Sequence, residues 1–174
     1  MEVSLGTQGS LVFNRLDPFL TEILRQIPDA ANPAGDANAL ARLSPPPIVG
    51  EVDDEFLQDW EDYVKPELQA LFSEALSVVS QDLLGLMNQP TNARNRLEIP
   101  LEHADAWINA LNQARIVLAE RHHFTEDELG KCGILCFESR RDLALVQMNF
   151  YAMIQEMLIR WISDDLEDLE LEES

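Results

Sequence analysis

The sequence predicts a mainly α-helical single domain, a helical bundle with a small β element. Apolar residues recur at three-and-four spacing over several long segments, which is the period of a helix with one buried face. Short strand-like runs occur in the N-terminal segment and near residues 96–100, and we expect these two segments to pair. A length of 174 residues suits one domain with its own core.

We place this domain at residues 1–163 and an acidic tail at residues 164–174. The tail "DDLEDLELEES" contains seven acidic residues, and the chain as a whole has 32 Asp and Glu against 12 Lys and Arg, a net charge of -20. Subtracting the tail still leaves -13. Nucleic acids and anionic membranes are bound mainly by Lys and Arg, so we expect neither as a partner. The simplest interpretation of this negative charge is that it keeps the protein soluble.

The first segment, "EVSLGTQGSLVFNRL", predicts a hairpin around "GTQG". A helix then follows in "DPFLTEILRQIP", with Asp17 as its N-cap, Pro18 in its first turn and Pro28 as its end. Its apolar face is expected to be buried, and consists of Phe19, Leu20, Ile23, Leu24 and Ile27.

Residues 29–52 are rich in Pro, Ala, Gly and Asn, and include three consecutive prolines. We expect a long surface loop here, either functional or disordered, and the composition favours disorder. A loop of this kind could become ordered on a partner.

Two helical pieces follow, "DDEFLQDWEDYV" and a longer helix that begins near Pro66. The apolar face of the longer helix is expected to be buried, and consists of Leu68, Leu71, Phe72, Ala75, Leu76, Val79, Leu83 and Leu86. The alternation in "NRLEIP" predicts a short strand.

The remaining chain predicts a helix at about residues 101–122 and a last long helix that begins near Ser139. Between them, Thr125 and Glu128 have the spacing of a capping box, and Gly130 follows as a stop. The last helix has a wide apolar face, so part of it could also form a homodimer interface. That face consists of Leu143, Val146, Phe150, Met153, Ile154, Met157, Leu158, Trp161 and Ile162.

Arg115 is the first candidate for a site, because it borders the apolar face that contains Trp107 and Leu111. A buried guanidinium needs an acceptor, and we expect Glu156 or a backbone carbonyl of the long loop. A structural ion pair that fixes helix register is the preferred interpretation. The alternative is a site for an anion or a carboxylate.

The three histidines do not predict a metal site. His103 and His122 lie at opposite ends of one predicted helix, roughly 28 Å apart, and no zinc-type spacing is present. A histidine near a helix C-terminus also interacts favourably with the helix dipole. We therefore expect no metal and no cofactor.

Cys132 and Cys136 are the two cysteines, and they form a candidate redox pair in "KCGILCF". Residues four apart in a regular helix are too distant for a disulfide, so bridging would require Gly133 to break the helix. Lys131 would favour a thiolate at Cys132, whereas the apolar neighbours of Cys136 indicate burial. Two buried structural cysteines are the simpler interpretation.

One long segment, "NRLEIPLEHADAWINALNQARIVLAERHHF", resembles the characteristic segment of a bacterial family, the domain-of-unknown-function family numbered twenty seventeen. "KPELQALFSEALSVVSQDLL" and "FYAMIQEMLI" are similar to two further helices of that family. Gln113 stands where the family often has Asp. The resemblance implies a helical fold and a polar and aromatic core formed by Trp107, Asn112, Arg115 and Glu156.

The sequence contains none of the common catalytic motifs, so we expect a non-enzymatic protein without catalytic residues. With two cysteines, no signal peptide and no apolar run long enough to span a membrane, the expected location is the cytoplasm. The expected function is that of a regulatory or adaptor protein that acts through contacts with a protein partner, one with a basic patch. The alternative is a thiol-based redox sensor that uses Cys132 and Cys136.

Overall fold

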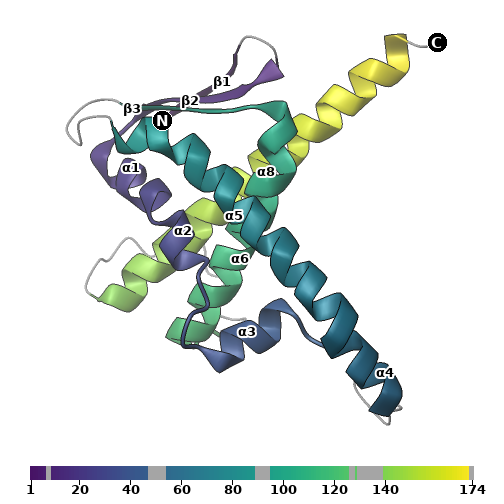
Figure 1. The fold of residues 1–174 in the computed structure, drawn as a ribbon. Coiled ribbons are helices and arrows are strands. Elements are labelled where there is room, and N and C mark those ends of the chain that lie inside the picture. The colour runs from purple at the N-terminus through teal and green to yellow at the C-terminus, as the bar shows by residue number, and fades with distance from the viewer. Residues whose placement is uncertain (7–8, 47–53, 89–94, 126–127, 129–138, 173–174) are drawn as a thin grey trace.

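The computed structural model describes residues 1–6, 9–46, 54–88, 95–125, 128 and 139–172. It confirms the predicted fold class, because helices dominate and a three-stranded antiparallel sheet covers one end of them (Figure 1). Two long helices, α5 (Lys65–Met87) and α8 (Arg140–Glu172), both pack against α6 (Ala104–His122). The hydrophobic core lies where these three helices meet the sheet and the first two helices.

The sheet joins the two segments that were predicted to pair. Its strand order is β1 (Glu2–Leu5), β2 (Leu11–Leu16) and β3 (Asn95–Ile99), with β2 in the centre. Phe13 of β2 lies opposite Leu97 of β3, and both side chains are buried. The central strand thus anchors the N-terminal segment on the helical core.

Helix α1 (Pro18–Arg25) begins as predicted, since the side chain of Asp17 accepts a hydrogen bond from the Leu20 amide at 2.9 Å. The prediction that Pro28 ends this helix is wrong. The helix ends at Arg25, and Pro28 lies in the first turn of α2 (Ile27–Ala30). A proline is well tolerated there because the first amides of a helix have no partner within the helix.

The expected loop at residues 29–52 also contains regular structure. Helix α3 (Ala37–Leu43) begins after Asp36, whose side chain accepts hydrogen bonds from the amides of Asn38 and Ala39 at 3.0 Å. This N-cap and the run of Ala and Leu that follows favour a helix, and packing against α6 supports its two turns, so the prediction of disorder is wrong for this part. Residues 47–53 lie outside the described part of the chain.

The two helical pieces after the loop form one continuous rod. Helix α4 (Asp54–Asp59) passes through a π-helical segment, η2 (Trp60–Val64), into α5. Pro66 has no amide hydrogen and its ring crowds the preceding turn, which is a common cause of local widening of a helix. Figure 1 shows α4 and the first turns of α5 extending away from the sheet and from α8.

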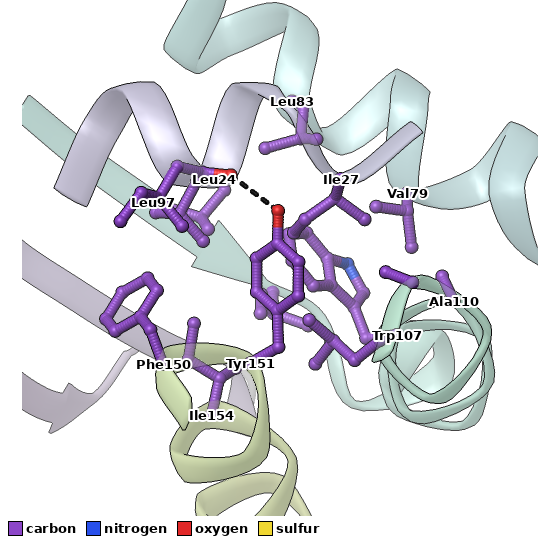
Figure 2. Packing of buried hydrophobic residues seen from close by; sticks show 14 of the residues in the cluster. Leu24, Ile27, Val79, Leu83, Leu97, Trp107, Ala110, Phe150, Tyr151 and Ile154 are labelled. Atoms are coloured by element: carbon purple, nitrogen blue, oxygen red, sulfur yellow. Dashed lines mark hydrogen bonds between the residues drawn. The ribbon is translucent and has the colours of Figure 1, made fainter. Parts of the chain in front are cut away.

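Helix α6 follows the short 3₁₀ turn η3 (Leu101–His103) and ends at His122. The residue after it, His123, caps the helix with a left-handed backbone of φ 50°. Helix α8 packs against α6, and its buried side chains include Leu158 together with Tyr151 and Ile154, the last two of which are labelled in Figure 2. The backbone of α8 remains helical through residues 164–172, the segment predicted as a tail, and these turns project beyond the core (Figure 1).

Three residues of the predicted apolar faces are exposed. Phe19, Leu71 and Leu143 are 41%, 60% and 38% accessible to solvent. Each lies near the end of its helix or at the border of its apolar face. Hydrophobic periodicity predicts which side of a helix is apolar, but it does not predict how far the neighbouring helices extend to cover that side. The large exposure of Leu71 matters for the site below.

Candidate functional site

Trp107 is fully buried, as predicted, and the structure supplies its hydrogen-bond partner. Its Nε1 donates to Oδ2 of Asp82 on α5 at 2.8 Å, and Nδ1 of His103 lies 3.0 Å from the same carboxylate. The side chain of Asp82 is only 10% exposed. This network joins the start of α6 to α5, and sequence analysis missed Asp82 although a buried tryptophan requires an acceptor.

Arg115 is half-buried, and its partner differs from the predicted one. Its Nη1 donates to Oε1 of Gln155 at 2.7 Å, and Nε2 of Gln155 donates to the carbonyl of Ile108 at 3.2 Å. The prediction of a pair with Glu156 is therefore wrong. Successive residues of a helix point about 100° apart, so α8 directs Gln155 toward α6 and Glu156 away from it.

Glu156 and Asn112 do not belong to a buried polar core. The side chain of Glu156 is 63% exposed and pairs with Arg160 one turn along α8. Asn112 is also exposed. It lines a shallow cavity of about 170 Å³ with Arg42 and Arg115, and Arg42 is paired there with Glu120 at 2.7 Å. This cavity is smaller than typical ligand sites of ~300–1,000 Å³.

Glu128 and Arg141 connect the end of α6 to the start of α8. Oε2 of Glu128 accepts hydrogen bonds from the amide and the hydroxyl of Thr125 at 2.9 Å, as the predicted capping box requires, and from Nη2 of Arg141 at 2.8 Å. These bonds, that of Arg141 first, lower the pKa of Glu128 to about 2. Arg141 also donates to the carbonyl of His122, the last residue of α6, at 3.2 Å. These bonds hold the end of α6 against the start of α8, and we call Thr125, Glu128 and Arg141 the clasp.

The predicted redox residues, Cys132 and Cys136, lie outside the described residues, as does Gly130. Burial and the nearby arginines lower the pKa of His122, so this histidine favours its neutral form. Within the described ranges, no three His, Cys, Asp or Glu side chains gather in a way that could hold a metal ion.

A cavity of about 500 Å³ lies between α5, α6 and the segment that contains α2 and α3. Its apolar lining residues come from α5, from α2 and from the segment that was predicted as a loop. They are Pro28, Pro33, Leu40, Leu43, Phe72 and Leu76. Polar side chains complete the lining, namely Asn32, Ser44, Gln69, Ser73 and Gln113.

Gln113 is the unusual member of this cavity. It is only 3% exposed, yet its buried Nε2 has no hydrogen-bond partner among the described residues. Buried amides are almost always hydrogen-bonded in native proteins, so an unpaired one is an informative feature. The sequence offers one signal, because Gln113 lies on α6 between the buried residues Leu111 and Ala114.

A second feature is an apolar stripe along the rod formed by α4, η2 and the first turns of α5. Phe56, Trp60, Val64 and Leu68 recur every four residues and are all at least partly exposed, and Tyr63 and Leu71 flank them. Phe56, Tyr63 and Leu71 are 43%, 69% and 60% exposed. We call these six residues the rod stripe.

Acidic residues surround the rod stripe. Residues 54–74 contain seven Asp and Glu and one lysine, which gives a net charge of -6 by subtraction. The lysine, Lys65, is paired with Glu61 one turn earlier. The rod therefore combines exposed aromatic and aliphatic side chains with a strongly negative surface, which sequence analysis treated as two ordinary helices.

The sequence model of one family, Domain of unknown function (DUF2017), matches residues 10–162 of this chain. The chain belongs to this family, as its helical segments had suggested. Comparison with curated proteins gave no match. Comparison with solved structures gave none either. In the described part of the chain, no helix is both long enough and apolar enough to cross a bilayer.

Proposed function

We propose that this chain is a non-enzymatic adaptor or regulatory protein that binds another protein through the rod stripe. The observation that carries the proposal is the exposure of aromatic and aliphatic side chains along one projecting helix. Clustered apolar residues on a surface, bordered by charged ones, are typical of an interaction site. The aromatic members Phe56, Trp60 and Tyr63 belong to the residue types enriched at such sites.

The chemistry of the rod favours a basic, amphipathic helix as the partner. A helix with leucine-type residues on one face could lie along the rod stripe, and lysines or arginines at its borders would meet the acidic side chains. A second copy of this chain is a less suitable occupant, because its rod would carry the same charge of -6. Opposite charge would also raise the rate of association.

We further propose that the protein works in the cytoplasm and that its partner is neither a nucleic acid nor a membrane. The charge of the whole chain, -20, supports the part of this proposal that concerns the partner, because it repels polyanions. The described site contains an apolar stripe and structural polar networks, rather than a nucleophile with an adjacent base.

The test uses a short synthetic helix of leucine and lysine with all leucines on one face. The control peptide has the same composition in scrambled order, so that it keeps the charge and loses the apolar face. Isothermal titration calorimetry with the full chain measures both. We expect the amphipathic peptide to bind at least about tenfold more tightly than the scrambled one, a difference of ~1.4 kcal/mol.

Two protein variants locate the binding surface. Phe56→Ser with Leu71→Ser removes two exposed members of the rod stripe, and Leu84→Ser with Ile159→Ser removes two comparably exposed residues elsewhere, 55% and 49% accessible. We expect the first variant to lose affinity and the second to keep it. Equal binding by both variants, or equal binding of both peptides, would show that charge alone attracts the peptide and would refute the proposal.

A further inference from the structure

We propose that the cavity beside Gln113 binds a neutral, mostly apolar small molecule that carries a carbonyl group. Its volume of about 500 Å³ lies within the ~300–1,000 Å³ of typical ligand sites. Such sites combine a mainly apolar wall with a few polar groups that orient the ligand. This inference does not depend on the rod stripe, which uses different side chains.

The wall of the cavity indicates an uncharged ligand. None of the described lining residues is acidic or basic. An ionised group would lose its hydration on entry and would meet no opposite charge among these residues, which is costly in an apolar site. Leu40, Leu43, Phe72 and Leu76 provide aliphatic and aromatic surface suited to a hydrocarbon or an aromatic ring.

Most of the polar lining groups are already engaged within their own segments. Oδ1 of Asn32 accepts from the amide of Ala34 at 3.0 Å. The hydroxyl of Ser44 donates to the carbonyl of Leu40 at 3.3 Å, and that of Ser73 donates to the carbonyl of Gln69 at 2.8 Å. These bonds lie within the turn before α3, the end of α3 and the first half of α5, so the bonded atoms already have partners.

Gln113 differs, because it lines the cavity and its buried Nε2 has no partner in the described part of the chain. An unpaired buried donor is destabilising, and a suitable acceptor removes that penalty. The last side-chain torsion of glutamine is broad and roughly two-fold, so the amide can turn toward a bound molecule at small cost. The group that fits this donor is a carbonyl oxygen on an otherwise apolar ligand.

The test compares three probes of similar size. Acetophenone has an aromatic ring and a carbonyl, ethylbenzene lacks the carbonyl, and benzoate adds a negative charge. Binding is followed by protein-detected ¹H–¹⁵N NMR, which also observes the side-chain amide of Gln113 directly. We expect saturable binding of acetophenone with a shift of the Gln113 amide signal, weaker binding of ethylbenzene without that shift, and the weakest binding for benzoate.

The variant Gln113→Met keeps the length of the side chain and removes the donor. We expect it to bind acetophenone about tenfold more weakly and ethylbenzene equally well. Ser73→Trp, at an exposed position on the rim, should obstruct both probes. If acetophenone causes no saturable shift of the Gln113 amide in the unmodified protein, the proposal is wrong. This readout needs no variant, so a folding defect in Gln113→Met cannot obscure it. Equal affinity of acetophenone for the protein and for a folded Gln113→Met would also overturn the proposal.

Discussion

The hydroxyl of Tyr151 on α8 donates a hydrogen bond to the backbone carbonyl of Ile23 on α1 at 2.8 Å, across the centre of the core (Figure 2). The same hydroxyl accepts from Nε2 of Gln147 at 2.7 Å. Both residues that meet here are buried, although 128 positions separate them in sequence. This pair therefore fixes the first helix against the last one.

We expect Tyr151→Phe to destabilise the protein by about 0.5–1.5 kcal/mol, because the Ile23 carbonyl and the Gln147 amide lose their shorter hydrogen bonds. They keep longer bonds to Gln26, of 3.3 Å and 3.4 Å. Urea denaturation measures the change. The matched control is Tyr63→Phe on the rod, where the tyrosine is 69% exposed and the same change should be nearly neutral. An equal effect at both positions would contradict the structural role of the Tyr151 bond.

Burial also raises the pKa of Tyr151 above its ordinary value. The folded state therefore favours the neutral phenol, and its stabilising effect is complete below the pKa of the unfolded chain, about 10. We expect the free energy of unfolding to decrease as the pH rises above that value, and to decrease less in Tyr151→Phe. Parallel pH profiles for the two proteins would refute this assignment.

Asp82 should be the most sensitive polar residue of α5. Asp82→Ala leaves the buried indole N–H of Trp107 without its acceptor, and we expect a loss of about 1–3 kcal/mol. Asp82→Asn retains a carbonyl oxygen for the indole and should cost less. Urea denaturation with tryptophan fluorescence compares the two variants, and an asparagine variant as unstable as the alanine variant would show that the carboxylate charge is what matters.

Arg115 should tolerate leucine better than alanine. The aliphatic part of its side chain is half-buried, and its guanidinium bonds to the neutral side chain of Gln155. Leucine would keep much of the apolar packing and lose the hydrogen bond, whereas alanine would lose both. We expect Arg115→Ala to cost about 1–2 kcal/mol and Arg115→Leu less than that. Thermal and urea denaturation measure both. An unchanged stability of Arg115→Ala would exclude a structural role.

The clasp of Thr125, Glu128 and Arg141 predicts a pH dependence on the acid side. The pKa of Glu128 is lowered to about 2, below its ordinary value of 4.5, so its contribution to stability is present above 4.5 and is lost as the pH falls toward 2. NMR titration of the Glu128 carboxyl should give this pKa directly. Arg141→Gln removes the main cause, so the pKa of Glu128 should rise toward its ordinary value in that variant.

The sequence predicted the fold class and most helices, because hydrophobic periodicity and capping residues are local signals. Asp17 and Ser139 mark the starts of α1 and α8 through contacts within three residues, and the structure contains both contacts. The same local rules missed α3, where composition suggested a loop and the cap at Asp36 was overlooked. Proline-rich composition describes a segment as a whole and does not exclude a short helix inside it.

The candidate sites were less predictable, because they depend on which helices pack against one another in the folded chain. Arg115 was recognised as a residue that needs an acceptor, but neighbouring positions on α8 differ by about 100° in direction, and the sequence alone did not distinguish Gln155 from Glu156. The exposure of Leu71 has a similar origin. Periodicity places it beside the buried face of α5, whereas the length of the neighbouring helices decides that this part of the face lies outside the core.

The π-helical segment Trp60–Val64 has a consequence for the direction of the side chains on the rod. In an unbroken α-helix, Trp60 and Leu68 would point roughly 80° apart, since eight residues exceed two full turns by that angle. The wider turn rotates less per residue and brings the two side chains closer to one line. Deleting one residue within it would restore an ordinary α-helix in which eleven residues separate Phe56 from Leu68, a rotation only about 20° beyond three full turns. The two side chains would therefore stay on one side of the rod. The wide turn thus accommodates one extra residue while the rod stripe continues along the same side of the helix.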